Sequence, residues 1–267
     1  MEGVAGIVDW SQVAAAQEPG LGQRLLLEEV NAAIDGALEG GALSFLVNDA
    51  HGAMRNLPPD QLHGEAEYCS GQHKPLYMME GLDGSFDACL FIGYHGAVDG
   101  PASVLSHTYN PAAIMGVSLN GHLVGESGIN ALVASHFQVP VALISGDQHT
   151  AAQAEFVMPG AELVVVKHSV TRLAARNLHP TMARRRIHDG TISALQRLSD
   201  ISPPKLPAPI RLEVRLRNAD LAQVALQVRG VQALSDLEVV LEGEDGLAVY
   251  RSFVGLVQIT RGLAQER

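Results

Sequence analysis

The sequence is poor in several features that mark particular classes of protein. Among 267 residues there are only two cysteines, Cys69 and Cys89, and they form no C-x-x-C motif. We therefore expect neither a disulfide scaffold nor a thiolate zinc site, but reduced thiols in a cytoplasmic protein. No apolar run approaches the ~20 residues that a membrane-spanning helix needs. The first residues include Glu2 and Asp9 instead of the basic residues of an export signal.

Basic residues and several familiar motifs are also scarce. The 18 Lys and Arg against 29 Asp and Glu give a formal net charge of -11. This charge disfavours nucleic acids and anionic membranes as partners, because both would be repelled. Neither phosphate-binding glycine motif, G-x-x-x-x-G-K-[ST] or G-x-G-x-x-G, is present, and neither is a G-x-S-x-G elbow or an H-E-x-x-H zinc motif. A small molecule or a peptide is the more natural partner.

The chain does contain helical and strand patterns that follow one another. Apolar residues recur at helical spacing over residues 23–38, and Gly40-Gly41 ends that helix. Asn120-Gly121 predicts a tight hairpin between residues 117–119 and 122–124. Short apolar runs predict buried strands, and the segments between them predict helices. The expected strands are 42–47, 88–92, 141–144 and 163–166, and the expected helices are one beginning after Glu126, one near 149–157 and one at 180–198.

This alternation predicts an α/β fold with a mostly parallel sheet flanked by helices. Four prolines between residues 202 and 209 predict a stiff connector. We therefore expect a main domain at 1–201 and a smaller α+β subdomain at 210–267, with a strand over 210–217 and a closing helix over 246–263. No internal repeat is visible.

Two histidines follow expected strands at the edge where α/β proteins usually place their sites. His51 follows the strand at 42–47, and His95 follows the strand at 88–92. Two imidazoles at one sheet edge can bind a metal, but each residue also has a plain alternative. His51 can cap a turn, His95 can be an ordinary pocket histidine, and Glu126 can be a first-turn acid favoured by the helix dipole. The other histidines have no metal-binding spacing.

Several segments together resemble the zinc-dependent D-aminopeptidases that bacteria encode with dipeptide-transport operons. The resemblance covers most of the chain up to the proline connector and is weaker after it. The segments that carry it are Glu2-Gly3-Val4-Ala5-Gly6, Glu28-Glu29-Val30-Asn31, Val47-Asn48-Asp49-Ala50-His51-Gly52, Lys74-Pro75, Met79-Glu80-Gly81-Leu82-Asp83, Gly93-Tyr94-His95, Ser106-His107-Thr108, Val124-Gly125-Glu126 and Val166-Lys167.

The resemblance implies a dinuclear zinc centre. It assigns His51 and Glu126 to one zinc ion, Glu2 and His95 to the other, and the catalytic role to His107. The loop from His95 to His107 is one residue longer than in the family pattern. Two neighbouring zinc ions can activate water and polarise the scissile carbonyl, and a carboxylate between them offsets their repulsion.

One part of the family pattern has no counterpart here. The family's first strand ends in Ser-x-Asp-x-Glu-Gly, and its aspartate bridges the two zinc ions, whereas this sequence contains only Glu2-Gly3. Asp9 lies in a departing loop and Asp49 is expected to face a turn, so neither replaces the bridge. We expect the natural protein to extend upstream of Met1.

The resemblance implies an aminopeptidase that hydrolyses short peptides with D-amino-acid N-termini, such as D-alanyl dipeptides, and that assembles into a ring-like homo-oligomer. Two alternatives remain. A non-catalytic peptide-binding homologue would explain the missing aspartate. A mononuclear zinc amidohydrolase would use the same side chains around one ion.

Overall fold

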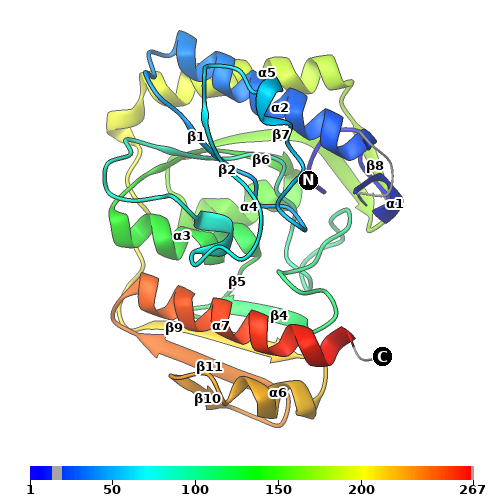
Figure 1. Ribbon diagram of the computed structural model, residues 1–267, viewed down its shortest axis with the longest axis vertical. Helices are drawn as coiled ribbons and strands as arrows, with labels where there is room; N and C mark the ends of the chain where they lie inside the picture. Colours follow the sequence, from blue (N-terminus) through cyan, green and yellow to red (C-terminus); the bar gives the residue numbers. More distant parts are fainter. Residues whose placement is uncertain (14–19, 266–267) are drawn as a thin grey trace.

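The structure is a computed structural model, and it describes residues 1–13 and 20–265. Three separately hydrogen-bonded sheets organise the chain (Figure 1). The first has the strand order β3-β6-β7-β8 and is parallel between β3, β6 and β7, with β8 antiparallel at its edge. Its strands are β3 (Cys89–Phe91), β6 (Val141–Asp147), β7 (Glu162–Thr171) and β8 (Ala174–Asn177).

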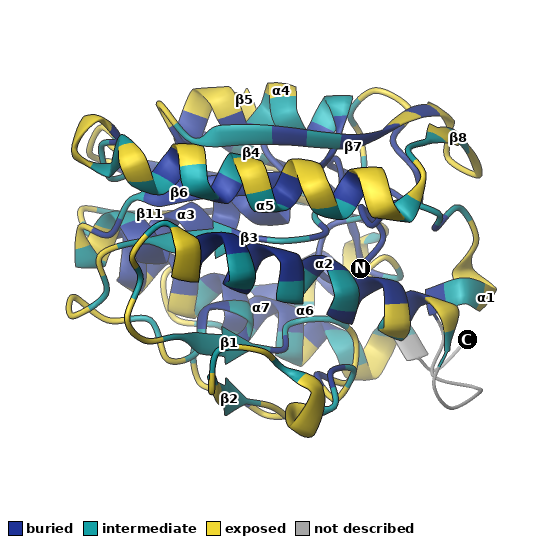
Figure 2. Ribbon diagram, turned by 90° about the horizontal axis from the view of Figure 1, so that it is seen from above, coloured by how far each residue is buried: buried dark blue, intermediate teal, exposed yellow. Residues whose placement is uncertain are grey.

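Helices cover both sides of this sheet, so the fold belongs to the expected α/β class. The helices α2 and α5 lie side by side on the upper side of the sheet, whereas α4 and α3 lie below it (Figures 1 and 2). The bounds are α1 (Trp10–Val13), α2 (Leu21–Glu39), α3 (Glu126–Phe137), α4 (Gln148–Val157) and α5 (Pro180–Gln196). The amphipathic pattern predicted α2 well because one side of the helix is buried, including Leu25, Leu26 and Ile34.

The second sheet is antiparallel throughout and has the order β10-β11-β9-β4-β5. Its elements and their neighbours are β4 (Ile114–Leu119), β5 (His122–Leu123), β9 (Ile210–Leu216), α6 (Ala219–Ala225), β10 (Val231–Ala233), β11 (Glu238–Gly243) and α7 (Gly246–Gln265). Asn120 and Gly121 make the predicted hairpin turn with φ of 49° and 81°. The segment 210–267 thus shares its sheet with two strands that precede the proline connector. The division at 202–209 stays a prediction.

The third sheet is a parallel pair of short strands, β1 (Leu46–Asn48) and β2 (Glu67–Cys69). The strand expected at 42–47 is therefore wrong over residues 42–45. Only residues 46–48 pair with β2, and Leu43 is 97% exposed. Three short 3-10 helices complete the described elements, at Pro59–Gln61, Tyr77–Met79 and Leu198–Asp200.

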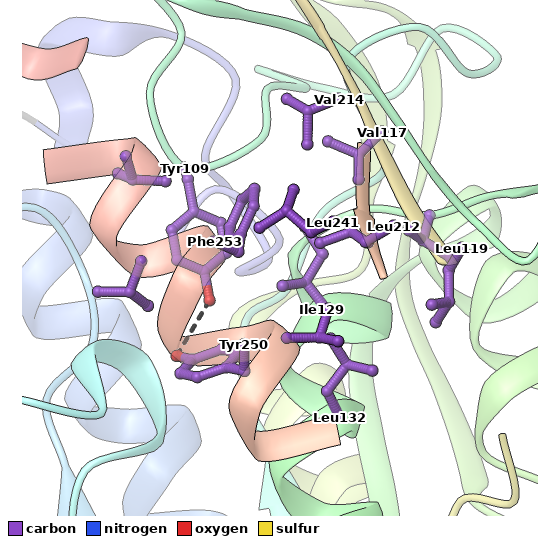
Figure 3. Close-up of a cluster of buried hydrophobic side chains, with 14 of the residues drawn as sticks. Tyr109, Val117, Leu119, Ile129, Leu132, Leu212, Val214, Leu241, Tyr250 and Phe253 are labelled. Carbon is purple, nitrogen blue, oxygen red and sulfur yellow. Dashed lines mark hydrogen bonds between the residues drawn. The ribbon is translucent and has the colours of Figure 1, made fainter. Parts of the chain in front are cut away.

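The main hydrophobic core packs the antiparallel sheet and α7 against α3. Side chains from α3, β4, β9, β11 and α7 meet in one cluster, which Figure 3 shows around Ile129, Leu212 and Phe253. At the edge of this cluster the Tyr109 hydroxyl donates to that of Tyr250, 3.2 Å away. None of the described helices combines the length and the apolar character that crossing a membrane requires.

Candidate metal centre

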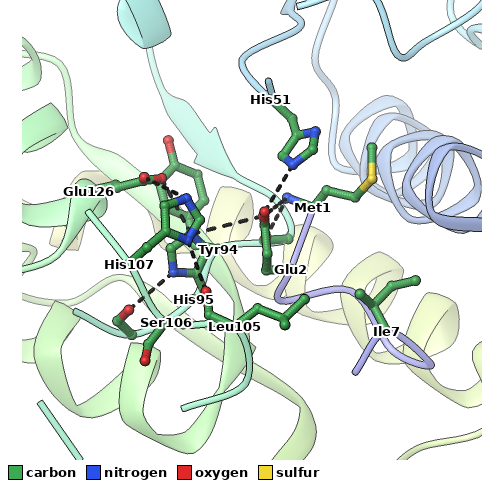
Figure 4. Close-up of polar contacts among 12 residues, drawn as sticks. Met1, Glu2, Ile7, His51, Tyr94, His95, Leu105, Ser106, His107 and Glu126 are labelled. Carbon is green, nitrogen blue, oxygen red and sulfur yellow. Dashed lines mark hydrogen bonds and ion pairs between the residues drawn. The ribbon is translucent and has the colours of Figure 1, made fainter. Parts of the chain in front are cut away.

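The five residues singled out from the sequence come together at the seam between the three sheets. His51 follows β1, His95 follows β3, and Glu126 follows β5 as the first residue of α3. Glu2 lies between His51 and the other site residues (Figure 4). Glu2, His95 and Glu126 are buried.

Two groups of contacts form the centre. His51 Nε2 lies 2.9 Å from Glu2 Oε1. The Nε2 atoms of His95 and His107 each lie 3.5 Å from a carboxylate oxygen of Glu126. Glu2 Oε2 links the groups, since it is 4.0 Å from His95 Nε2. His51 therefore contacts Glu2 directly. The assignment of His51 and Glu126 to one zinc ion, which the resemblance implies, stays a prediction.

Backbone carbonyls orient the two inner imidazoles. Nδ1 of His95 lies 3.1 Å from the Gly96 carbonyl, and Nδ1 of His107 lies 2.9 Å from the Leu105 carbonyl. When Nδ1 carries the proton and donates it to the carbonyl, Nε2 keeps its lone pair free for a metal or a proton. The two rings stack with centroids 4.3 Å apart.

The local electrostatics keep both carboxylates ionised. Burial by itself would raise the pKa of Glu126, but the neighbouring His95 and His107 outweigh it and lower this pKa to about 2. Burial opposes ionisation of Glu2 as well, yet neighbouring positive charge, to which His51 and His95 contribute, holds its pKa well below the usual value. Burial and the nearby His95 lower the pKa of His107, so this imidazole is neutral near pH 7.

The donor set fits zinc. One nitrogen or oxygen from each of His95, His107 and Glu126 lies within 4.8 Å of the others, a spacing that lets three side chains share an ion. His51 Nδ1 is buried and has no hydrogen-bond partner among the described residues. The expected bridge is not supplied by Asp49, because Asn56, Leu57 and Tyr68 donate hydrogen bonds to its carboxylate. Asp9 instead accepts from Ser11 at the start of α1.

Close backbone packing positions Glu2. A Cβ atom on Gly3 would lie 1.7 Å from the Tyr94 carbonyl oxygen, so only glycine allows the loop to cross there. The Gly3 amide donates to the Gly93 carbonyl at 3.1 Å. The loop that carries Glu2 is thereby tied to the loop that carries His95.

Sequence reasoning did not assign roles to several residues around the centre. The backbone amide of Tyr109 donates to Glu126 Oε1 at 2.8 Å from a left-handed conformation with φ of 57°. Lys167, on β7, is 1% exposed and donates to the carbonyls of Glu2 and Ile7. The sequence could have indicated Lys167, because a lysine at the end of an apolar strand run must find polar partners. Nothing in the sequence indicates that Trp10 lies near the centre, where its ring centroid is 5.5 Å from that of His107.

Buried histidines and carboxylates that converge at strand ends define a metallohydrolase centre. The model of the peptidase family M55, described as D-aminopeptidase, matches residues 1–254. This chain belongs to that family of hydrolases.

Two relatives agree with this assignment over nearly their whole lengths. A D-aminopeptidase of Bacillus subtilis (strain 168) is 33% identical over 264 residues, which cover 97% of this chain and 94% of that protein. The solved structure described as the Zn-dependent D-aminopeptidase DppA from Bacillus subtilis, a self-compartmentalizing protease, superposes with a TM-score of 0.91. It is 32% identical and the match covers 98% of this chain and 95% of the other.

Proposed function

We propose that this protein is a zinc aminopeptidase that removes D-configured N-terminal residues from short peptides, with D-alanyl dipeptides as the substrate class. The observation that carries the proposal is the convergence of His95, His107 and Glu126 on one point, with Glu2 and His51 beside them. The family and both Bacillus subtilis relatives support the preference for D-amino acids.

Zinc would be held by Glu2, His51, His95 and Glu126, and when bound it supplies a Lewis acid that polarises the scissile carbonyl. We assign the proton transfer to His107. Its low pKa and its Nδ1 contact with Leu105 leave Nε2 able to take a proton from the attacking water and deliver it to the leaving amine. The ionised carboxylates of Glu2 and Glu126 complement positive charge at the centre.

Two ions per chain remain the proposed stoichiometry. The resemblance assigns His51 and Glu126 to one ion and Glu2 and His95 to the other. The contacts of Glu2 with both histidines and of Glu126 with His95 support two neighbouring places for zinc. A mononuclear amidohydrolase is the second candidate, because the one three-residue donor group found among residues 1–13 and 20–265 consists of His95, His107 and Glu126. In that case His107 would be a ligand and not the proton carrier.

The deciding experiment is the zinc-to-chain ratio, measured by elemental mass spectrometry on protein purified without chelator, together with hydrolysis of D-Ala-D-Ala. We expect two zinc ions and release of D-alanine. One zinc ion that is lost in His107→Ala would favour the mononuclear centre. No zinc and no hydrolysis would contradict the proposal. Exposed His63 contacts Asp35 away from the centre, so His63→Ala is the matched control and should keep both ions.

We further propose that the protein acts in the cytoplasm as a homo-oligomer that encloses its sites. The term self-compartmentalizing in the description of the Bacillus subtilis structure supports such an assembly. The net charge of -11 and the scarcity of cysteine support a cytoplasmic enzyme whose partners are peptides and neither nucleic acids nor membranes. Light scattering coupled to size-exclusion chromatography tests the oligomer, since a monomer of 28.3 kDa would contradict it.

A further inference from the structure

A large aromatic side chain stands beside the proposed proton carrier and remains partly open to solvent. Trp10 is the only tryptophan of the chain and is 40% exposed. Its ring is tilted by 56° against that of His107, with the centroids 5.5 Å apart. One part of the indole therefore lies at the centre while another part is available for contact with a ligand.

The backbone around Trp10 is held firmly. The Gln12 side chain accepts hydrogen bonds from the amides of Val8 and Asp9 at 2.7 and 2.9 Å. Gly22 of α2 lets α1 approach closely, because a Cβ there would lie 2.5 Å from the Gln12 carbonyl oxygen. The start of α1, where Trp10 lies, is thus tied to the preceding loop and to α2, and α1 lies near the N-terminal end of the chain (Figure 1).

Glu2 and Trp10 belong to the same short stretch of chain. The loop that follows Glu2 is fixed at both ends by Lys167, which binds the carbonyls of Glu2 and Ile7, and α1 begins three residues later. A site carboxylate and the aromatic ring are therefore positioned by one rigid segment. An exposed indole on such a support offers a large apolar contact at low entropic cost.

We propose that Trp10 is a specificity-determining residue that receives the side chain of the substrate residue on the leaving side of the scissile bond. This inference rests on the proposed function, in which His107 delivers a proton to the leaving amine. A group that touches His107 is placed to contact the residue attached to that amine. Trp10 therefore favours peptides whose second residue is apolar and large.

The test compares Trp10→Ala and Trp10→Phe with the unchanged protein on four dipeptides: D-Ala-Gly, D-Ala-D-Ala, D-Ala-D-Phe and D-Phe-D-Ala. We expect Trp10→Ala to raise KM for D-Ala-D-Phe roughly tenfold and to leave KM for D-Ala-Gly within about twofold, with kcat little changed. Trp10→Phe should keep the KM for D-Ala-D-Phe close to that of the unchanged protein. Phe156→Ala is the matched control, because Phe156, on α4, is also exposed (45%) and also stacks on a histidine, His122 of β5.

A binding measurement gives a second readout that does not depend on turnover. Emission from the single tryptophan reports on position 10 alone, so titration with the non-hydrolysable reduced-amide analogue of D-Ala-D-Phe should change it saturably. The analogue of D-Ala-Gly should change it much less.

The outcomes separate the two proposals. If the unchanged protein cleaves none of the four dipeptides, the proposed function fails. If the unchanged protein cleaves them but Trp10→Ala does not raise KM for D-Ala-D-Phe relative to D-Ala-Gly, the assignment of Trp10 is overturned. It is also overturned if Trp10→Ala raises KM mainly for D-Phe-D-Ala, in which the large residue comes first. An unchanged emission at saturating analogue would overturn it as well.

Discussion

Lys167 Nζ donates a hydrogen bond to the backbone carbonyl of Glu2, and it also donates to the carbonyl of Ile7, at the other end of the same loop, at 2.7 Å. Glu29, on α2, accepts from the amide of Ala5 between these two points at 2.9 Å. Two buried ionisable side chains, one basic and one acidic, thus satisfy the polar backbone of the segment that presents Glu2. Their loss should loosen the centre without removing any donor from it.

We expect Lys167→Met to lower the free energy of unfolding by about 2–4 kcal/mol, because it strands two buried carbonyls and the buried Glu29. It should also weaken zinc binding. Urea unfolding and zinc titration measure both effects. Exposed Lys205→Met serves as the control and should stay within roughly 0.5 kcal/mol. Equal zinc affinity in Lys167→Met and the unchanged protein would contradict a positioning role.

Glu29 should give the zinc-free protein an unusual pH dependence. Burial, only partly offset by the Ala5 amide and Lys167, raises its pKa from 4.5 to about 7. The folded state then binds more protons than the unfolded state between these values, so stability falls as pH rises from 4.5 to 7. The fall amounts to roughly 3 kcal/mol at about 1.4 kcal/mol per unit.

Glu29→Gln should remove this fall while keeping an acceptor for Ala5. The variant should match the unchanged protein at pH 5 and exceed its stability at pH 8, as measured by urea unfolding with a chelator present. Exposed Glu39→Gln should leave the slope unchanged. A variant that is less stable at pH 8 than the unchanged protein would disprove the assignment.

Gly3 should tolerate no side chain. Gly3→Ala would place a methyl group 1.7 Å from the Tyr94 carbonyl oxygen, which forces the Glu2 loop away from Tyr94. We expect a loss of about 3 kcal/mol or more together with loss of zinc. Gly262→Ala, on α7 with open space around the added atom, should instead gain about 0.5–1 kcal/mol. Thermal unfolding of both variants checks the contrast.

Tyr250 connects the C-terminal helix to the wall of the centre. Its hydroxyl donates to the Leu76 carbonyl at 2.9 Å and accepts from Tyr109, whose amide holds Glu126. Tyr250→Phe should cost about 1–2 kcal/mol, because it removes two buried hydrogen bonds, although Asn130 still accepts from Tyr109 and the Met79 amide still donates to Leu76. Tyr77→Phe should cost less, since the partner of its hydroxyl, Arg261, can reach water. Equal losses in urea unfolding would contradict this reasoning.

Local patterns predicted the long helices and the hairpin well. The three long helices α2, α5 and α7 begin and end within two residues of the expected positions, and for α2 the ground was repeated apolar spacing. Asn120-Gly121 also forms its turn, because both residues adopt the positive φ that the turn needs. Such features depend on neighbours in sequence.

Long-range pairing could not be predicted in the same way. Nothing in residues 114–119 indicates that they pair with residues 210–216, since register between distant strands depends on the whole fold. The strands β2, β8 and β10 were missed because they have only three or four residues, and β11 was missed as well. For His51, position alone left a turn cap and a metal ligand as equal alternatives, and for Glu126 it favoured a first-turn acid over a ligand. Only the family resemblance indicated a metal site.

The seam on which the centre lies also has a consequence for how the protein matures. His51, His95 and Glu126 follow strands of three separate sheets, so no local piece of the chain can gather the three side chains. Loop closure over these distances comes late in folding. Under the proposed function, zinc would therefore bind only after the three sheets have docked, and its binding would stabilise the docked arrangement. A chain without zinc would lack that stabilisation at the seam.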